Sequence, residues 1–182
     1  MNPENYILRQ IQSDDDTTKF SLGDAAYTPL KIFLQKTAFD FHQHDIAKTY
    51  VLVNQMSPPS KVWGYITLMN SEIVLYEGQR PQESAATSRY EAFPAVKIAR
   101  LAVDKTLRGN GFGAMLLVWC INHVKFAIVP HVGCRFLVVD AKRDSVAFYQ
   151  KSGFILLDTA SNHTDEHPLM FFDLHNQVQN KI

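Results

Sequence analysis

The segment Arg108-Gly109-Asn110-Gly111-Phe112-Gly113 joins two apolar runs of different periodicity. Residues 96–103, VKIARLAV, precede it and predict a strand, whereas residues 114–121, AMLLVWCI, follow it and predict an amphipathic helix. Its three glycines permit the positive φ values that aim successive backbone N–H groups at one point. The helix N-terminus behind them favours negative charge. The segment therefore predicts a cradle for a phosphate.

Length and composition narrow the class of protein. The chain has 182 residues, of which 46% are hydrophobic, so we expect one domain over residues 1–182 with a sizeable core. No apolar run is long enough to span a bilayer, and residues 1–20 are polar and acidic rather than signal-like. Cys120 and Cys134 lie in apolar contexts and predict buried thiols. We expect a cytoplasmic protein with no membrane partner.

Charge is distributed unevenly along the chain, although the net charge is zero. Residues 97–151 contain nine Lys and Arg against three Asp and Glu, whereas residues 1–96 and residues 152–182 each carry a net charge of −3. This basic block contains the glycine-rich loop. A polyanionic ligand would be attracted to that part of the chain.

The remaining pattern predicts an α/β protein with a mixed sheet. Residues 56–60 predict a turn, and residues 77–94, which lack periodicity, predict a long loop. Helices are expected at residues 29–42, 111–125 and 145–151, the last of them ended by Gly153. Strands are expected at residues 6–11, 49–53, 62–69, 96–103, 134–139, 154–157 and 169–172.

The residues of the loop alone leave three interpretations open. Gly109-x-Gly111-x-x-Ala114, with Asp140 at the end of the next strand, also fits the dinucleotide-binding fingerprint. In that fold the glycines follow the strand almost directly and open a large doubly wound sheet. Here residues 104–108 intervene and only about forty residues follow Asp140, which disfavours that fold. A glycine turn without any ligand is the third interpretation.

Two motifs, found in this order, resemble the GNAT N-acetyltransferase superfamily. Arg108-x-x-Gly111-x-Gly113 is similar to its Arg/Gln-x-x-Gly-x-Gly/Ala signature, and residues 148–154, FYQKSGF, resemble its FYxKxGF segment. The resemblance covers residues 96–157, which would bind acetyl-CoA, and leaves residues 20–95 to the acceptor. It implies the GNAT fold, in which helices flank a mixed, mostly antiparallel sheet with a splayed parallel pair at the cofactor site.

The resemblance also implies roles for individual residues. Backbone N–H groups of the loop would bind the pyrophosphate of acetyl-CoA, and the strand before the loop would pair with the pantetheine arm. A backbone N–H of that strand would stabilise the oxyanion that develops on the thioester carbonyl. Tyr149 resembles the general acid of the family; its structural alternative is a core aromatic, the role expected of Phe148. The cofactor-binding residues would be Leu101, Ala102, Val103, Arg108, Gly109, Asn110, Gly111, Phe112, Gly113, Ala114 and Lys142.

The chain departs from the family at residues 140–144, DAKRD, where many members carry an asparagine that contacts pantetheine. Lys142 or Arg143 would contact a phosphate of coenzyme A instead. Arg100 lies in the middle of a strand, so we expect it in a buried ion pair or against an anionic group of substrate or cofactor. His42-x-His44 lacks further ligands, and no metal is expected.

The acceptor is the least constrained part of the prediction. The main expectation is a primary amine of a small molecule or protein, which attacks the thioester directly. The N-terminal half, with TYVLV at residues 49–53 and WGYITL at residues 63–68, loosely resembles a toxin-like subgroup that acetylates the α-amine of aminoacyl-tRNA. That alternative implies tRNA and an antitoxin as partners. A non-catalytic acyl-CoA-binding module is the third alternative, and the superfamily's frequent dimers make a homodimer compatible with all three.

A lysine-type amine would need a general base, because its pKa is about 10.4, whereas an α-amine with a pKa near 8 is already partly neutral at pH 7. No strong base stands out among the glutamates on or near the long loop, which are Glu72, Glu77, Glu83 and Glu91. The lack of a dedicated base favours an α-amine acceptor.

Overall fold

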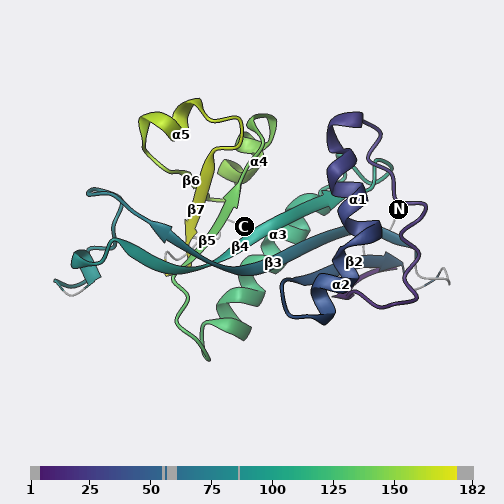
Figure 1. The fold of residues 1–182 in the computed structure, drawn as a ribbon, viewed down its shortest axis with the longest axis horizontal. Helices are drawn as coiled ribbons and strands as arrows, with labels where there is room; N and C mark the ends of the chain where they lie inside the picture. The colour runs from purple at the N-terminus through teal and green to yellow at the C-terminus, as the bar shows by residue number, and fades with distance from the viewer. Residues whose placement is uncertain (1–4, 55, 57–60, 86, 176–182) are drawn as a thin grey trace. The chain divides into compact units, whose positions relative to one another are not determined.

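The computed structural model describes residues 5–54, 56, 61–85 and 87–175 (Figure 1). Within these residues the chain forms a seven-stranded sheet in the order β1-β2-β3-β4-β5-β7-β6. The strands are β1 (Tyr6–Gln10), β2 (Lys48–Asn54), β3 (Val62–Val74), β4 (Ala92–Val103), β5 (Phe136–Asp140), β6 (Ile155–Leu156) and β7 (Leu169–Asp173). The α-helices are α1 (Thr28–Lys36), α2 (Ala38–Gln43), α3 (Phe112–His123), α4 (Val146–Lys151) and α5 (Ala160–Thr164).

The sheet is mixed, as the sequence predicts. The pairs β1–β2, β2–β3, β5–β7 and β6–β7 are antiparallel. The pair β4–β5 is parallel, with a register that runs from Ala95 opposite Phe136 to Lys97 opposite Val138. The expected α/β class with a mostly antiparallel sheet and a parallel pair is therefore confirmed.

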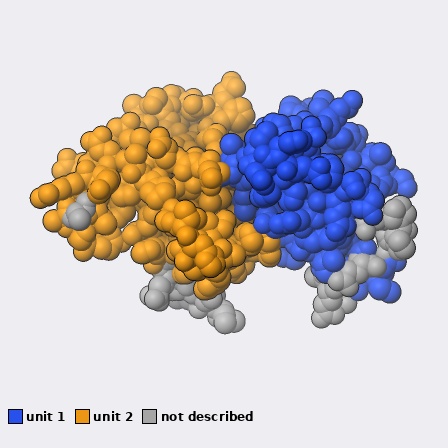
Figure 2. All heavy atoms as spheres, turned by 60° about the horizontal axis from the view of Figure 1, so that its bottom comes forward, with its two compact units in different colours: residues 1–69, 99–117 blue, residues 70–98, 118–182 orange. Residues whose placement is uncertain are grey.

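The chain divides into two compact units, which Figure 2 colours separately. Unit 1 comprises Met1–Met69 and Ala99–Leu117, and unit 2 comprises Asn70–Ile98 and Val118–Ile182. Each unit has its own cluster of buried apolar side chains. None of the helices in the described ranges has the length and hydropathy of a membrane-spanning segment.

Unit 1 buries β2 on both faces, because successive side chains of a strand point to opposite sides of the sheet. Val51 and Val53 join a cluster that includes Leu34 of α1 and Ala38 of α2. Leu52 points the other way, into a cluster with Val103, Leu107, Phe112 and Leu116. The turn before α3 and the first turns of that helix therefore belong to the core of unit 1.

Unit 2 has a core of aromatic side chains. The ring of Phe136 on β5 meets Phe93 of β4 and Phe171 of β7 edge to face, with centroid distances of 5.6 and 5.8 Å. Gly153, which ends α4, has φ +89°, and a Cβ there would lie 3.1 Å from the Phe172 ring. The expected end of the helix at this glycine is confirmed, since both the φ value and the close approach favour glycine.

The helix expected at residues 29–42 is wrong as a single element. The chain leaves helical geometry at Thr37, where φ is −130°, and resumes as α2. Threonine is β-branched and has a slightly lowered helix propensity, so little stability is lost when it leaves helical geometry. The apolar spacing continues across this break because both short helices pack on the same cluster.

The long loop predicted at residues 77–94 is shortened by β4, which begins inside it, and β3 runs further toward it than the strand expected at residues 62–69. β3 continues to Val74, and the Leu75 N–H donates to the Glu91 carbonyl at 2.8 Å. β4 begins at Ala92, so Pro94 lies inside a strand rather than in the loop. Residues 70–72 are polar, so the spacing of apolar side chains did not predict that β3 continues to Val74.

Three smaller differences concern the last third of the chain. α3 gives way after His123 to a π-helical turn at Val124–Ile128. β6 has two residues rather than four, and α5 had no apolar stripe to predict it.

Residues 57–60 of the expected turn lie outside the described residues.

Candidate active site

The glycine-rich loop has the backbone geometry that its sequence predicts. Gly109 and Gly111 have φ values of +77° and +80°, which favour glycine, and a Cβ at either position would meet nothing within 4 Å. Gly113 lies inside α3, so the expectation of a positive φ at all three glycines is wrong for this one. Two open, left-handed glycines leave room for a ligand close to the backbone.

α3 begins directly behind these glycines. The Met115 N–H donates to the Gly111 carbonyl at 3.0 Å, which is the first bond of the helix. The N–H groups of the first turn, from Phe112 to Ala114, have no acceptor within the helix. Phe112 itself is buried and its ring lies 5.0 Å from that of Tyr6, so the helix start is anchored. The arrangement suits an anion, because unpaired N–H groups and the helix dipole converge there.

Asp104 is a functional residue that sequence analysis missed. Its residue surface is 1% exposed, and its carboxylate accepts hydrogen bonds from the Ser21 N–H (2.9 Å), the Thr106 N–H (3.0 Å) and the Thr106 hydroxyl (2.7 Å). Lys61 Nζ lies 3.9 Å from the same carboxylate. The Asp104 N–H also donates to the Trp63 carbonyl at 2.7 Å. Asp104 thus ties the turn before the glycine-rich loop to two other segments of unit 1.

The charge of Asp104 is stabilised despite its burial. Burial by itself raises the pKa of this carboxyl. Hydrogen bonds from Thr106 and Ser21, together with the nearby Lys61, lower the pKa by more than burial raises it, so the pKa lies below its ordinary value. The Asp-x-Thr spacing at residues 104–106 was the available signal, because Asp commonly caps the backbone two residues later. Residues 104–108, which separate the predicted strand from the glycines, therefore form a turn that hydrogen bonds hold in place.

The two arginines near the loop lie over aromatic rings. Arg100 is exposed and its guanidinium lies 4.9 Å from the Phe33 ring centroid, so its expected alternative as a buried ion pair is wrong. Arg100 points to solvent from β4, between the half-buried residues Ala99 and Leu101. Arg108 is also exposed, with its guanidinium 4.9 Å from the Tyr27 ring centroid. Both remain available to an anionic ligand.

The strand before the loop brings backbone rather than side chains to the site. Ala102 and Val103 are buried and Leu101 is half-buried. A Cβ on Gly64 would lie 3.2 Å from the Ala102 carbonyl oxygen, so glycine allows β3 to approach this part of β4 closely.

Tyr149 is a buried residue of α4, in unit 2. Its ring meets those of Phe148 and Phe154 edge to face at 5.0 and 5.5 Å. Phe148 is only half-buried, so of the two neighbouring aromatics Tyr149 is the core one, contrary to expectation. Burial, with a smaller contribution from Cys120, raises the pKa of Tyr149 well above its ordinary value. The phenol therefore stays protonated at physiological pH and can act as a donor.

Part of the basic block is occupied by structural contacts within unit 2. Lys97 pairs with Asp140 at 2.5 Å, and Arg135 Nε pairs with Asp173 at 2.7 Å. Arg143 donates to the backbone carbonyls of Asn162 and His163. Of the two cations expected at a coenzyme A phosphate, Arg143 thus has a structural role in unit 2.

Several of the acidic and histidine side chains singled out in the sequence already have partners of their own. Glu83 pairs with Arg135 and Glu91 pairs with Arg80, so two of the four glutamates near the loop are in ion pairs. His42 Nδ1 accepts from the Thr49 N–H at 3.1 Å, which gives it a structural role. No cluster of three metal-ligating side chains occurs among the described residues. Both cysteines are free and buried, as expected.

Comparison with known proteins agrees with this geometry. A family model described as an acetyltransferase (GNAT) domain matches residues 50–156. A tRNA-acetylating toxin of Mycobacterium tuberculosis is 27% identical over 156 residues, which are 85% of this chain and 87% of the toxin.

Two solved structures of another toxin, AtaT, are similar over almost the whole chain. AtaT complexed with acetyl-methionyl-tRNAfMet is 28% identical, with a TM-score of 0.75, and the match covers 92% of this chain and 94% of that one. A tyrosine-to-phenylalanine mutant of AtaT, bound to the C-terminus of the antitoxin AtaR and to acetyl-CoA, is 27% identical, with a TM-score of 0.71 and coverage of 93% and 94%.

Proposed function

Because the chain belongs to the GNAT acetyltransferase family, whose acetyl donor is acetyl-CoA, we propose that it acetylates the α-amine of aminoacyl-tRNA. One observation carries this proposal. The family model begins at residue 50, yet the similarity to toxins described as acting on tRNA extends over 85–92% of the chain. The N-terminal region outside the family model is thus shared with those toxins, and in this fold it is the region left to the acceptor.

The chemistry of the acceptor supports the same choice. An α-amine with a pKa near 8 is partly neutral at pH 7 and can attack without a strong base, whereas a lysine amine is almost fully protonated. Glu83 and Glu91 are in ion pairs, and the Arg135 guanidinium lowers the pKa of Glu83, which makes this carboxylate a weaker base. An aminoacyl ester therefore suits this chain better than the lysine side chain of a protein.

The loop fits the pyrophosphate of acetyl-CoA. Gly109 and Gly111 leave open space above the backbone, and the unpaired N–H groups at the start of α3 supply donors to an anion. We assign the pyrophosphate to the backbone of residues 108–114, the pantetheine arm to the backbone of residues 101–103, and a coenzyme A phosphate to Lys142. Arg100 is assigned to an anionic group of substrate or cofactor, since its side chain is exposed.

The transfer needs two kinds of stabilisation. The amine nitrogen forms a bond to the thioester carbonyl carbon, the carbon–sulfur bond breaks, and the sulfur leaves as a thiolate that takes up a proton. A backbone N–H of residues 101–103 would stabilise the developing oxyanion. Tyr149 would donate its phenolic proton toward the departing sulfur and regain one from solvent, while the product amide loses the extra proton of the attacking amine.

A toxin of this kind would be cytoplasmic and would have an antitoxin as partner. AtaT is described as bound to the C-terminus of the antitoxin AtaR, and similarity to that complex supports a peptide partner for this chain. We propose that this protein arrests growth and that co-expression of a cognate antitoxin relieves the arrest.

A panel of acceptors tests the proposal. Purified protein is supplied with acetyl-CoA, and release of the coenzyme A thiol is followed with charged tRNA, uncharged tRNA, free amino acids, small amines and a lysine-containing peptide. We expect release that requires charged tRNA. Faster release with a small amine or the peptide would make those the acceptors, and binding of acetyl-CoA without transfer to any amine would favour a non-catalytic module.

A further inference from the structure

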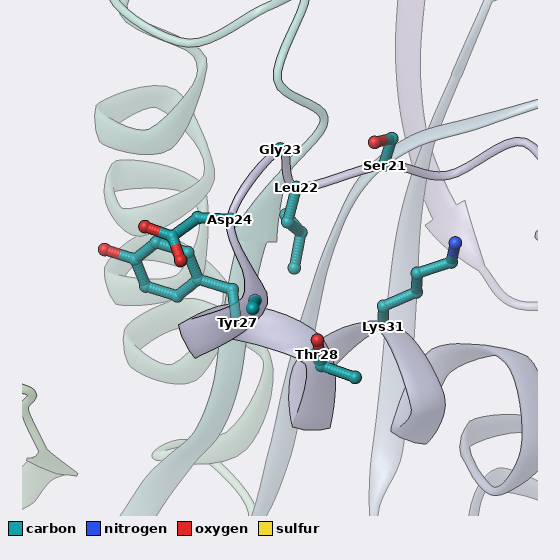
Figure 3. A pocket seen from close by; sticks show the side chains of 8 residues that line it. Ser21, Leu22, Gly23, Asp24, Tyr27, Thr28 and Lys31 are labelled. Carbon is teal, nitrogen blue, oxygen red and sulfur yellow. The ribbon is translucent and has the colours of Figure 1, made fainter.

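A polar pocket of about 270 Å³ lies where the chain enters α1, within unit 1 (Figure 3). Residues 21–25, Tyr27, Thr28 and Lys31 line it. Pockets for whole small molecules are larger, about 300–1,000 Å³, and mostly apolar. A polar pocket of this size suits one group of a larger ligand.

One cationic side chain lines this pocket, and two more lie against residues that line it. Lys31 lines it and, in Figure 3, extends from α1 toward the Ser21 end of the segment. The aliphatic part of Lys105 packs so close to Gly23 that a Cβ there would lie 3.3 Å from its Cδ. Arg108 lies over the Tyr27 ring. Among the described residues, the amines of Lys31 and Lys105 have neither an ion pair nor a hydrogen bond.

One carboxylate also lines the pocket, and it is already engaged. Asp24 accepts a hydrogen bond from the Ala26 N–H at 2.8 Å and caps the short 3-10 helix at Ala25–Tyr27. The buried Asp104 carboxylate, which accepts from the Ser21 N–H, has Lys61 as its own partner. The three cations at or next to the pocket therefore outnumber the Asp24 carboxylate, and the excess positive charge favours an anion.

We propose that this pocket binds a backbone phosphate of the RNA acceptor, as a site separate from the pyrophosphate cradle. The inference rests on the proposed function and names the part of the chain that holds the RNA. Lys31 and Lys105 supply charge to the phosphate oxygens, and Arg108 belongs to the loop and lies over the ring of Tyr27, which lines the pocket.

The position of the pocket in the sequence favours the acceptor over the cofactor. Residues 21–31 lie outside the family model, which covers residues 50–156 and includes the whole glycine-rich loop. Lys105 and Arg108 lie inside the family model, whereas every residue that lines the pocket lies outside it. Acetyl-CoA is the substrate that the family shares, so a lining outside the shared part favours the substrate that varies.

Hydrogen bonds hold the pocket beside the loop. The Ser21 N–H donates to the Asp104 carboxylate at 2.9 Å, and the Lys105 N–H donates to the Ser21 carbonyl at 2.8 Å. This double link fixes the wall of the pocket to the turn that carries Lys105 and leads to Arg108. A phosphate would meet cations whose backbone positions are set in advance, which lowers the entropic cost of binding.

Charge reversal tests the proposal. The variant Lys31→Glu/Lys105→Glu is compared with Lys36→Glu, which reverses an exposed lysine of the same helix that does not line the pocket. The affinity for purified tRNA is measured over a range of salt, and the affinity for acetyl-CoA is measured by calorimetry on the same preparations. Retained acetyl-CoA binding also reports that the variants are folded.

We expect the double variant to bind tRNA at least tenfold more weakly than wild type, with acetyl-CoA affinity within twofold. The salt dependence should fall by about 0.7, the value for the one single-strand phosphate that the protein no longer neutralises. Lys36→Glu should change tRNA affinity much less. Unchanged tRNA binding in the double variant would contradict phosphate binding at the pocket. An equal loss of acetyl-CoA affinity would show that the two lysines bind the cofactor instead. If wild type binds acetyl-CoA but no tRNA, the proposed function fails as well.

Discussion

Asp104 and Tyr149 are both buried, but their surroundings keep the first side chain ionised and the second neutral. Three hydrogen bonds and a lysine keep the Asp104 carboxylate ionised. Aromatic neighbours and burial keep the Tyr149 phenol neutral. The first is suited to hold a backbone turn in place, and the second to deliver a proton.

The Asp104→Asn variant should lose stability and weaken the cofactor site. An amide keeps one acceptor oxygen but presents an N–H₂ group to N–H donors, so we expect a loss of about 1–3 kcal/mol and a several-fold rise in the KM for acetyl-CoA. Asp16→Asn is the matched control, because Asp16 accepts from the Thr18 N–H and hydroxyl in the same local motif but lacks the link to Ser21. Urea unfolding and steady-state kinetics give both quantities. A loss equal to that of the control would contradict the role of the Ser21 link.

The same carboxylate predicts a pH dependence. Its folded pKa is lower than the unfolded value of about 3.9, so its contribution to stability is complete above that value and is lost as pH falls through the folded pKa. The stability difference between wild type and Asp104→Asn should therefore be constant between pH 6 and 8 and shrink below about pH 4. Thermal unfolding across this range measures it. A difference that grows on acidification would contradict the assignment.

The Tyr149→Phe variant should separate catalysis from folding. Removal of the phenolic proton should lower kcat by about 100-fold or more, with little change in melting temperature or acetyl-CoA affinity, because the ring contacts remain. Phe148→Leu is a control for packing on the same helix. An unchanged kcat in Tyr149→Phe would leave Tyr149 as a core aromatic only.

At the scale of elements, the strand, loop and helix around residues 96–123 form the part of the fold most fully determined by local sequence. Glycines at positive φ, an apolar strand and an apolar helix each specify their own geometry. The break at Thr37, the extension of β3 and the helix α5 depend on packing partners distant in sequence, so apolar spacing alone did not locate them. Asp104 escaped for the same reason, since its decisive partner, Ser21, is 83 residues away.

The loop element can be tested with one pair of glycine substitutions. Gly111→Ala and Gly78→Ala both force alanine into positive φ, at +80° and +92°, with no atom within 4 Å of the new Cβ. Each should cost roughly 1–2 kcal/mol of stability from backbone strain. Only Gly111→Ala should also weaken acetyl-CoA binding, because its Cβ enters the open space above the loop. Equal effects on acetyl-CoA affinity would remove the pyrophosphate from this loop.

The whole molecule combines a family-wide acetyl-CoA site with an N-terminal region that the family model does not include. The motifs at residues 108–113 and 148–154 were sufficient to predict the family, the fold class and the acetyl donor. The acceptor was not predictable to the same degree, because the cations at or next to the pocket come from two distant parts of the sequence, Lys31 and the turn with Lys105 and Arg108. The basic block at residues 97–151 pointed to the glycine-rich loop, but Lys31 lies in the acidic part of the chain, so charge along the sequence gave no signal for the pocket.

Mass spectrometry of the reaction product tests the central claim most directly. Charged tRNA is incubated with the protein and acetyl-CoA, digested with nuclease, and examined for N-acetylaminoacyl-adenosine. Wild type should produce this nucleoside, and Tyr149→Phe should produce it at about one-hundredth of the rate or less. If wild type transfers acetyl groups to a small amine or a peptide but forms no N-acetylaminoacyl-adenosine, aminoacyl-tRNA is not its acceptor.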